Sequence, residues 1–361
     1  MAYTTFDEGD IIDGNIVRGV TSTAFSNNSG SLVLFHTSST QTASAAGEYQ
    51  WEIYNLATTE TTAEVQFSVA YGHYQGLGGS TQTGATSGYT PSKAIYNQFR
   101  NLLLNDTDET TKFGFGDNTY ADRMYFVTMN RARYKQGVNA GNWELHLSSS
   151  FWPNQFGGGH ENPLKLTDDS SVSNGSTVNG HLVYNIVSGS ETTLFTESDG
   201  DYHYWGLFYP ELGIFALNGD RIISGSGANG SSTYGLQLNT GSEVIGPNGL
   251  SVDTYDQMNA NLTAAIQRGK YFALRAEEDV TSTHYFVRAK NQEYNYSTNP
   301  TYQTGSNGQL KHTSFIQNPQ TYVTTVGLYN DLNELLAIAK LSKPLLKNFE
   351  RETTIRVKLD Y

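Results

Sequence analysis

Alternation of apolar and polar residues predicts β-strands along much of the chain. In Thr353–Tyr361, every second residue from Ile355 onward is apolar and the residues between are polar. The same period of two runs through Glu64–Tyr71 and Trp143–Leu147. Because successive side chains of a strand point to opposite faces, these stretches predict antiparallel strands with one buried face.

Turn-forming residues join several of these strands into expected hairpins. The first joins 322–329 to 334–341 through Asn330-Asp331-Leu332-Asn333, the second joins 205–209 to 213–217 through Pro210-Glu211-Leu212, and the third joins 271–276 to 284–289 through Glu277-Glu278-Asp279. Asn and Asp favour such connections because they tolerate left-handed backbone conformations. Pro344 has no N–H to donate, so we expect it to end the strand that begins near Glu334.

Only two helices are predicted, and both are expected to pack on sheets. Ser92 is the expected cap of the first helix, which ends at Asn105-Asp106 and carries an apolar face of Ile95, Phe99 and Leu102. Thr254 and Gln257 form a capping-box pattern at the start of the second. Its apolar face is Met258, Leu262, Ala265 and Ile266, with Arg268 in the last turn and Gly269 just beyond.

These elements predict a mainly β protein of antiparallel β-sandwich-like domains with long loops and about two packing helices. We expect two domains, residues 1–151 and 163–361, joined by the Pro- and Gly-rich segment between them. An alternative arrangement has strands near the two termini pairing with each other, which would close one domain around an inserted middle.

Composition narrows the function classes. The 361 residues hold 22 Lys and Arg against 35 Asp and Glu, a net charge of −13, which argues against binding to nucleic acid. There is no cysteine, so disulfides, thiolate zinc sites and cysteine nucleophiles are excluded. No run of about 18 apolar residues predicts a membrane span, and residues 1–10 resemble no secretory signal, so we expect a soluble protein made in a cytoplasm.

Several short motifs resemble cofactor or metal sites, but none has the context such a site needs. Gly225–Gly230 matches G-x-G-x-x-G without a helix directly after it. Asp106-Thr107-Asp108 begins like a calcium loop but has Thr111 where glycine is required, so it is expected to end the first helix. Asp199, Asp201, His203 and His160 have no diagnostic spacing. We therefore expect neither a cofactor nor a metal ion.

No catalytic residue is predicted either. The chain has no G-x-S-x-G motif, and His73 continues an apolar strand face, where a structural role is expected. Carboxylates that could serve a glycoside hydrolase exist in Glu277-Glu278-Asp279 and Asp168-Asp169. Such runs of acids usually lie on solvated turns, so the sequence favours a protein without enzymatic activity.

Long polar stretches rich in Gly, Ser, Thr and Asn separate the predicted elements: 21–47, 75–91, 153–163, 224–252 and 295–311. Most exceed the usual length of loops in compact domains, and the 24 tyrosines supply rigid contact area beside them. Trp152, Phe156 and Tyr89 lie in or next to these stretches and are our candidate interface residues. They could contact a neighbouring subunit or stack on a sugar, or they could close the core of their own domain.

Several stretches of the sequence resemble virion structural proteins of contractile-tailed bacteriophages, especially those of cyanobacteria. These are Leu274–Arg288 with its continuation through Asn295–Ser297, Thr324–Asp331, Ala337–Pro344, Val69–Tyr74 and Asn142–Leu147. The resemblance implies a component of the virion, in the tail baseplate, whose partners are other virion proteins or further copies of itself.

The resemblance identifies no catalytic or ligand-binding residue that could be carried over to this chain. Two other functions remain open: a carbohydrate- or receptor-binding virion module, and a decoration protein of the head or neck. The expected mode of action is assembly through exposed strands, loops and tyrosines, without insertion into a membrane.

Overall fold

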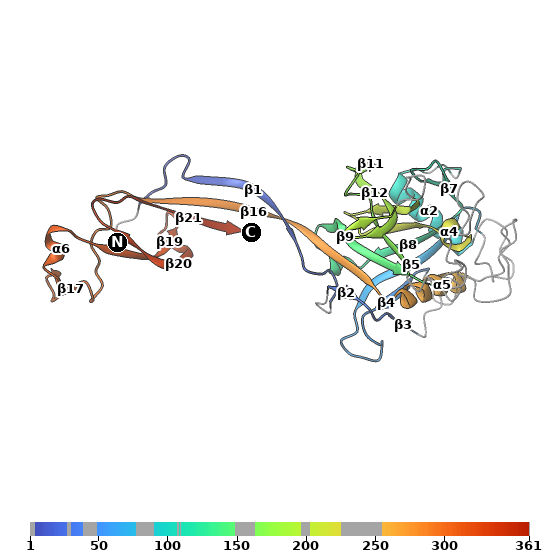
Figure 1. The fold of residues 1–361 in the computed structure, drawn as a ribbon, viewed down its shortest axis with the longest axis horizontal. Helices are drawn as coiled ribbons and strands as arrows, with labels where there is room; N and C mark the ends of the chain where they lie inside the picture. The colour runs from blue at the N-terminus through green and yellow to red at the C-terminus, as the bar shows by residue number, and fades with distance from the viewer. Residues whose placement is uncertain are drawn as a thin grey trace. The chain divides into compact units, whose positions relative to one another are not determined.

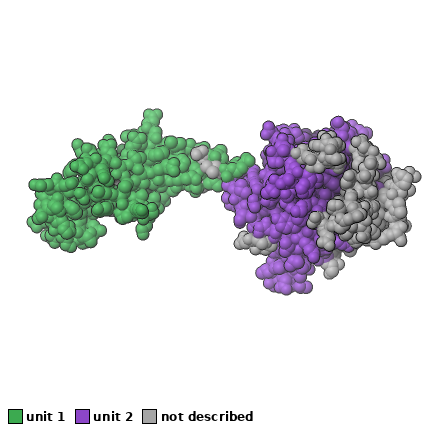
Figure 2. Space-filling view, in the orientation of Figure 1, with its two compact units in different colours: residues 1–18, 279–361 green, residues 19–278 purple. Residues whose placement is uncertain are grey.

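The fold is mainly β with antiparallel sheets, as the sequence predicted, and the residues that the structure describes contain four α-helices where about two were predicted (Figure 1). The structure is a computed structural model that describes residues 4–26, 30–38, 49–76, 90–106, 108, 110–148, 163–195, 203–224 and 255–360. Within these residues the chain forms two compact units, coloured separately in Figure 2. Unit 1 comprises residues 1–18 and 279–361, and unit 2 comprises residues 19–278.

This division differs from the expected boundary between residues 151 and 163. Strands β9 (Gly137–Leu147) and β10 (Leu164–Asp168) flank that segment and pair with each other, with Leu147 opposite Leu164. A domain boundary there would break a sheet. The chain instead leaves unit 1 and returns to it through β1 (Ile11–Val20) and β16 (Phe272–Ala289), which are neighbours in the sheet order. Segments near both ends of the chain therefore belong to one unit, with the middle inserted.

Unit 2 is built on one long antiparallel sheet. The described strands of this sheet that lie wholly in unit 2, besides β9 and β10, are β2 (Ser31–Leu32), β3 (His36–Thr37), β4 (Trp51–Tyr54), β5 (Val65–His73), β8 (Arg123–Met129), β11 (Ser176–Val178), β12 (His181–Ser190), β13 (Thr193–Leu194), β14 (Tyr204–Tyr209) and β15 (Ile214–Asn218). Strands β6 (Phe113–Gly114) and β7 (Tyr120–Ala121) form a separate two-stranded sheet. The main order is β1-β16-β9-β10-β12-β14-β15-β8-β5-β4-β3. The hairpin predicted through Pro210-Glu211-Leu212 is confirmed as β14 and β15, with Tyr209 opposite Ile214.

The sheet of unit 2 curls so that strands far apart in its order share one aromatic core. The ring centroid of Phe272 in β16 lies 5.4 Å from that of Phe67 in β5 and 5.9 Å from that of Phe215 in β15. Trp143 of β9 meets Phe215 edge to face at 4.7 Å. Aromatic pairs in such geometries add to the free energy gained from burial alone, so this core gives unit 2 its stability.

Helix α2 (Pro91–Leu104) covers the opposite face of β5 and β8. The Phe99 ring of this helix stacks on the Phe126 ring, with centroids 3.9 Å apart. The helix also lies close to β5, since a Cβ added at Gly72 would lie 3.0 Å from the backbone of Tyr96. The predicted helix is confirmed, but two details were wrong. Thr90 caps it by accepting a hydrogen bond from the Lys93 amide, because Pro91 already occupies the first helical turn. Leu103 is buried in place of the predicted Leu102, which is exposed.

Helix α5 (Tyr255–Gly269) packs beside β9 and β5 through the predicted apolar face of Met258, Leu262, Ala265 and Ile266. Its predicted cap, Thr254, lies outside the described residues. Gly269 is the last helical residue, not the first residue beyond, and a Cβ there would lie 2.0 Å from the carbonyl oxygen of His146. The glycine thus permits close approach of helix and strand, while the left-handed conformation follows at Lys270 (φ 54°). The described part of unit 2 also contains a short helix, α4 (Gly219–Ser224), and a 3-10 turn, η1 (Arg131–Arg133).

The third predicted hairpin does not exist, because Glu277-Glu278-Asp279 lies within the continuous 18-residue strand β16. Residues 277–283 contain no Gly, Pro or Asn that would favour a tight turn. Each half of the strand also has its own antiparallel partner: Phe272–Glu277 pairs with β9, and Ser282–Ala289 pairs with β21 (Thr353–Asp360). These ladders keep the whole segment extended.

Unit 1 combines the second half of β16, most of β1, β21 and a hairpin of β19 (Thr321–Tyr329) and β20 (Leu335–Lys347). Smaller elements are β17 (Gln303–Thr304), β18 (Gln309–Leu310) and α6 (Ser314–Gln317). The hairpin and the half-buried strand β21 are confirmed. Pro344, however, does not end β20: it lies in residues 341–344, which are bulged out of the pairing before Leu345 resumes it opposite Val323.

The core of unit 1 is small. Its buried apolar cluster consists of Val326 and Leu328 of β19 and Val357 of β21, with half-buried neighbours from β16, β20 and β21. Polar anchoring supplements it, since the buried Lys347 donates from Nζ to the carbonyl of Asn291 (2.9 Å) and to Oδ1 of Asn295 (3.0 Å). Burial lowers the pKa of the Lys347 ammonium, which means that its solvation is only partly replaced.

Candidate functional site

The predicted interface residues cannot be placed. Tyr89, Trp152 and Phe156 all lie outside the described residues, as do His160, Asp199, Asp201 and Gly225–Gly230. In the described ranges, no three His, Asp or Glu side chains gather as a metal site would require, and no helix there has the length and apolar character to span a bilayer.

The acidic loop at Asp106 and Asp108 ends helix α2, as expected. Asp106 accepts hydrogen bonds from the Thr111 hydroxyl (2.6 Å) and the Asp108 amide (2.8 Å), and Asp108 accepts one from the Thr110 amide (2.9 Å). These bonds, that of Thr111 first, hold the pKa of Asp106 below its usual range. The carboxylates therefore serve as local turn-forming acceptors.

The candidate acids of a hydrolase have structural roles. Asp168 accepts hydrogen bonds from the Gly141 amide (2.8 Å) and from Nε1 of Trp143 (2.5 Å), so it fixes the core tryptophan. Its neighbour Asp169 binds the backbone amide and the side chain of Asn185, and burial raises the pKa of this carboxyl. The two acids thus join β9, β10 and β12.

The acids in the middle of β16 also have partners on neighbouring strands or turns. Glu277 accepts a hydrogen bond from Nδ2 of Asn139 (2.6 Å), and Glu278 forms an ion pair with Lys135. Within unit 1, Asp279 pairs with Arg18 at 3.6 Å, where both side chains are exposed. Each of these three acids is therefore held by a polar or charged partner.

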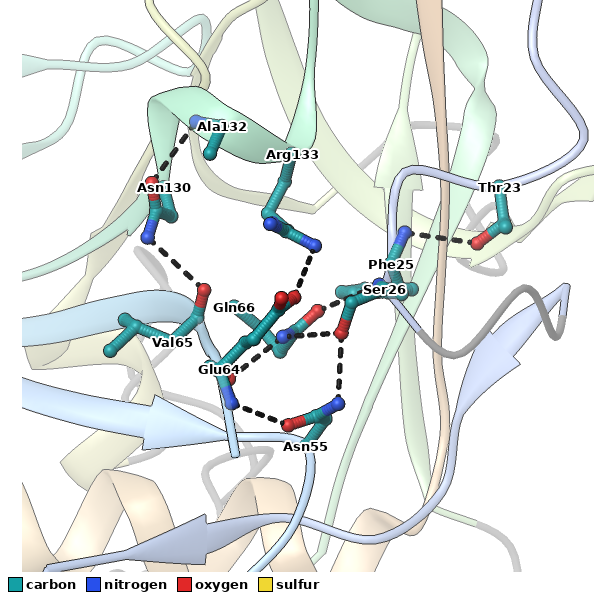
Figure 3. Close-up of polar contacts among 10 residues, drawn as sticks. All are labelled: Thr23, Phe25, Ser26, Asn55, Glu64, Val65, Gln66, Asn130, Ala132 and Arg133. Atoms are coloured by element: carbon teal, nitrogen blue, oxygen red, sulfur yellow. Dashed lines mark hydrogen bonds and ion pairs between the residues drawn. The ribbon is translucent and has the colours of Figure 1, made fainter. Parts of the chain in front are cut away.

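A polar network ties the segment after β1 to the turn between β4 and β5 (Figure 3). Figure 3 shows Asn55 and Gln66 converging on Ser26, whose hydroxyl accepts from Nδ2 of Asn55 (2.8 Å) and Nε2 of Gln66 (2.9 Å). Arg133 forms an ion pair with Glu64 at 2.9 Å on the same side. The buried Gln66 is fully engaged, since its Oε1 accepts from the Ser26 amide (3.1 Å). The network fixes these loops against the sheet.

Two open hollows lie beside this network in unit 2. The first, of about 450 Å³, is lined by Ser26, Leu32, Val33, Leu34, Asn55, Leu56, Thr62 and Glu64. The second, of about 540 Å³, is lined by Tyr49, Gln50, Glu52, Val65, Phe67, Ser68, Ile95, Gln98, Thr128, Met129 and Asn130. Both volumes fall within the range of ligand-binding cavities. No local sequence motif marks either one, because their walls come from strands and helices separated in the chain.

In unit 1, the β19–β20 hairpin exposes a group of large apolar side chains, which we call the outer face. It comprises Tyr329, Leu332, Leu335, Leu336 and Ile338, with exposed fractions from 38% to 78%. The alternate residues Ala337 and Ala339 turn inward with Val326 and Leu328. The ring of Tyr329 and a methyl group of Leu335 lie over Gly327. A Cβ added at Gly327 would lie 2.9 Å from the Tyr329 ring and 3.2 Å from the Leu335 methyl group.

The outer face was detectable in the sequence. Residues 335–339 are all apolar, whereas a strand with one solvated face alternates apolar and polar residues. Apolar residues on both faces are typical of strands that are covered on both sides. Among the described residues of unit 1, the inner face packs on the buried cluster and the outer face is exposed.

Comparisons with known proteins identify no relative of the chain: no family model, no curated protein and no solved structure matches it. The functional conclusion therefore depends on the residues and surfaces described above.

Proposed function

We propose that the chain is a structural subunit of a phage virion, located in the tail baseplate, which acts by protein–protein assembly and without catalysis. The virion and its baseplate are suggested by the sequence resemblance described above. The observation that supports assembly is the outer face of unit 1, where five large apolar side chains are exposed above a core of three buried ones. Covering such a face with another protein would stabilise both.

The distribution of charge supports unit 1 as the part that associates. Unit 1 contains 10 Lys and Arg against 11 Asp and Glu, whereas unit 2 contains 12 against 24. Most of the net charge therefore resides in unit 2. Because like charge opposes association, the nearly neutral unit 1 is the better surface for close contact with other subunits of the particle.

The test is incorporation of variants into phage particles. Leu336→Ser combined with Ile338→Ser removes apolar area from exposed positions, so the free energy of unfolding should change by less than about 0.5 kcal/mol per site. We expect this double variant to be lost from purified particles, because its contact with neighbouring subunits is weakened. The matched control is Leu102→Ser, an exposed leucine of α2 in unit 2, which should be incorporated normally.

A reconstruction of the intact particle by cryo-electron microscopy gives the second readout. Density for the chain in the baseplate, with the outer face covered by another subunit, would support the proposal. Density at the head or neck would establish the decoration function instead. Normal incorporation of the Leu336→Ser/Ile338→Ser variant would contradict a role of the outer face in assembly.

A further inference from the structure

The larger hollow of unit 2, which we call the groove, has polar side chains on its floor that form one row across three strands. Glu52 of β4 lies opposite Ser68 of β5, and Ser68 in turn lies opposite Thr128 of β8. Residues directly opposite in neighbouring strands project from the same face of the sheet. The register therefore places a carboxylate and two hydroxyls side by side along the floor of a cavity of about 540 Å³.

Further hydrogen-bonding groups surround this row. Gln50 accepts a bond from the Ser68 hydroxyl at 3.3 Å, and the Tyr54 hydroxyl donates to Oε2 of Glu52 at 2.6 Å, which orients the carboxylate. Helix α2 forms a wall through the buried Ile95 and the exposed amide of Gln98. Asn130 also lines the cavity, but its amide is engaged with the Val65 carbonyl and the Ala132 amide.

The lining combines hydroxyls, amides and one carboxylate with the half-buried ring of Tyr49. Hydroxyl-rich ligands suit such a surface, because amide and carboxylate groups can pair with adjacent hydroxyls while an aromatic ring contacts the apolar face of a sugar. No Lys or Arg is among the described residues that line the hollow, and unit 2 has a net charge of −12. Phosphate, sulfate and anionic sugars would therefore be repelled.

We propose that this groove, floored by Glu52, Ser68 and Thr128 and walled by Gln98, binds a neutral oligosaccharide. Binding without cleavage is the expected outcome, because glycoside hydrolysis uses two carboxyl groups about 5–9.5 Å apart, and Glu52 is the one carboxylate among the lining residues that the structure describes. The proposal goes beyond the assembly function and involves a different unit and different residues, so either can fail without the other.

The test uses the full chain on a glycan array that carries neutral and anionic oligosaccharides, followed by NMR titration with the neutral sugars that bind. Gln98→Ala and Thr128→Val each remove one groove hydrogen-bonding group, and we expect each to weaken binding by about three- to tenfold, as the loss of one net hydrogen bond does. Gln98 is exposed on a helix, so its alanine variant should fold as the wild type does.

Two controls make the result specific. Thr325→Val is the same chemical change on the exposed face of β19 in unit 1, and Glu60→Gln alters an exposed acid of the β4–β5 connection that lines neither hollow. Both should bind like the wild type. The proposal is overturned if no neutral sugar binds, if anionic sugars bind best, or if the groove variants bind as tightly as the controls.

Discussion

The two units reach stability in different ways. In unit 2 a curled sheet buries aromatic rings from β5, β9, β15 and β16 against one another, and helices α2 and α5 cover further faces. In unit 1 a hairpin lies over a few strands, and the buried apolar cluster of its described residues has three members. One chain can thus contain a unit that buries an extensive aromatic core and a unit that leaves several large apolar side chains exposed.

The largest expected effect lies in the core of unit 2. Phe272→Ala would remove a ring that contacts Phe25, Phe67 and Phe215. A fully buried phenylalanine in such a site contributes through both burial and cavity formation, so we expect a loss of about 3–5 kcal/mol in the free energy of unfolding. Urea unfolding followed by fluorescence measures it. A loss below about 1 kcal/mol would mean that the aromatic core is not what holds unit 2 together.

The second largest effect is expected in the pH dependence of the free energy of unfolding of unit 2. Burial lowers the pKa of His73 from 6.5 to about 4, with the nearby positive charge of Arg123 as a further cause, and its Nδ1 accepts a bond from the Gln75 amide (3.0 Å). This agrees with the structural role expected for His73. Between pH 6.5 and 4 the unfolded chain holds more protons than the folded one, so stability is lost as the pH falls through this window.

The expected loss at pH 4.5 is about 2–3 kcal/mol relative to pH 7. His73→Asn retains an acceptor but cannot titrate, so the part of the pH dependence due to His73 should disappear. Urea unfolding at both pH values measures the difference. The control is His312→Asn, an exposed histidine of unit 1, which should keep the wild-type dependence. If His73→Asn keeps it as well, the histidine is not buried in its neutral form.

A smaller and more local effect is expected in unit 1. Leu328→Ala removes a buried side chain from a cluster that is already partly open to solvent. We expect a loss of about 2 kcal/mol, at the low end for leucine, because the site can collapse or admit water. Hydrogen exchange should accelerate in residues 321–347 and remain unchanged in β5 and β8. Equal acceleration in both units would show that they unfold together, against the comparison above.

Much of the fold was predictable where local pattern and tertiary environment agree. The β14–β15 and β19–β20 hairpins combine alternating strands with turn-forming residues, and helix α5 has a complete apolar face. The errors arose where distant partners decide the outcome. The acids of β16 suggested a turn, but ladders with β9 and β21 hold them extended, and Pro344 is accommodated by a bulge that no local pattern announces.

The candidate sites were less predictable than the fold. The outer face of unit 1 could be inferred from five consecutive apolar residues, but whether its second face is covered depends on tertiary structure. The polar row of the groove depends on the register of β4, β5 and β8, which brings Glu52 within one strand of Ser68 and two of Thr128. Nothing in the local sequence around these residues indicates their proximity.

The pairing of β1 and β16 has a consequence for synthesis on the ribosome. Asp13 of β1 accepts a hydrogen bond from Thr283 of β16, a residue made 270 positions later. Unit 2 can fold once residue 278 has left the ribosome. Residues 11–18 of β1, in contrast, stay unpaired until β16 and then β21 have been synthesised. An exposed strand edge of this kind is vulnerable to aggregation, so slow translation or chaperone capture of residues 11–18 should govern the yield of correctly folded chain.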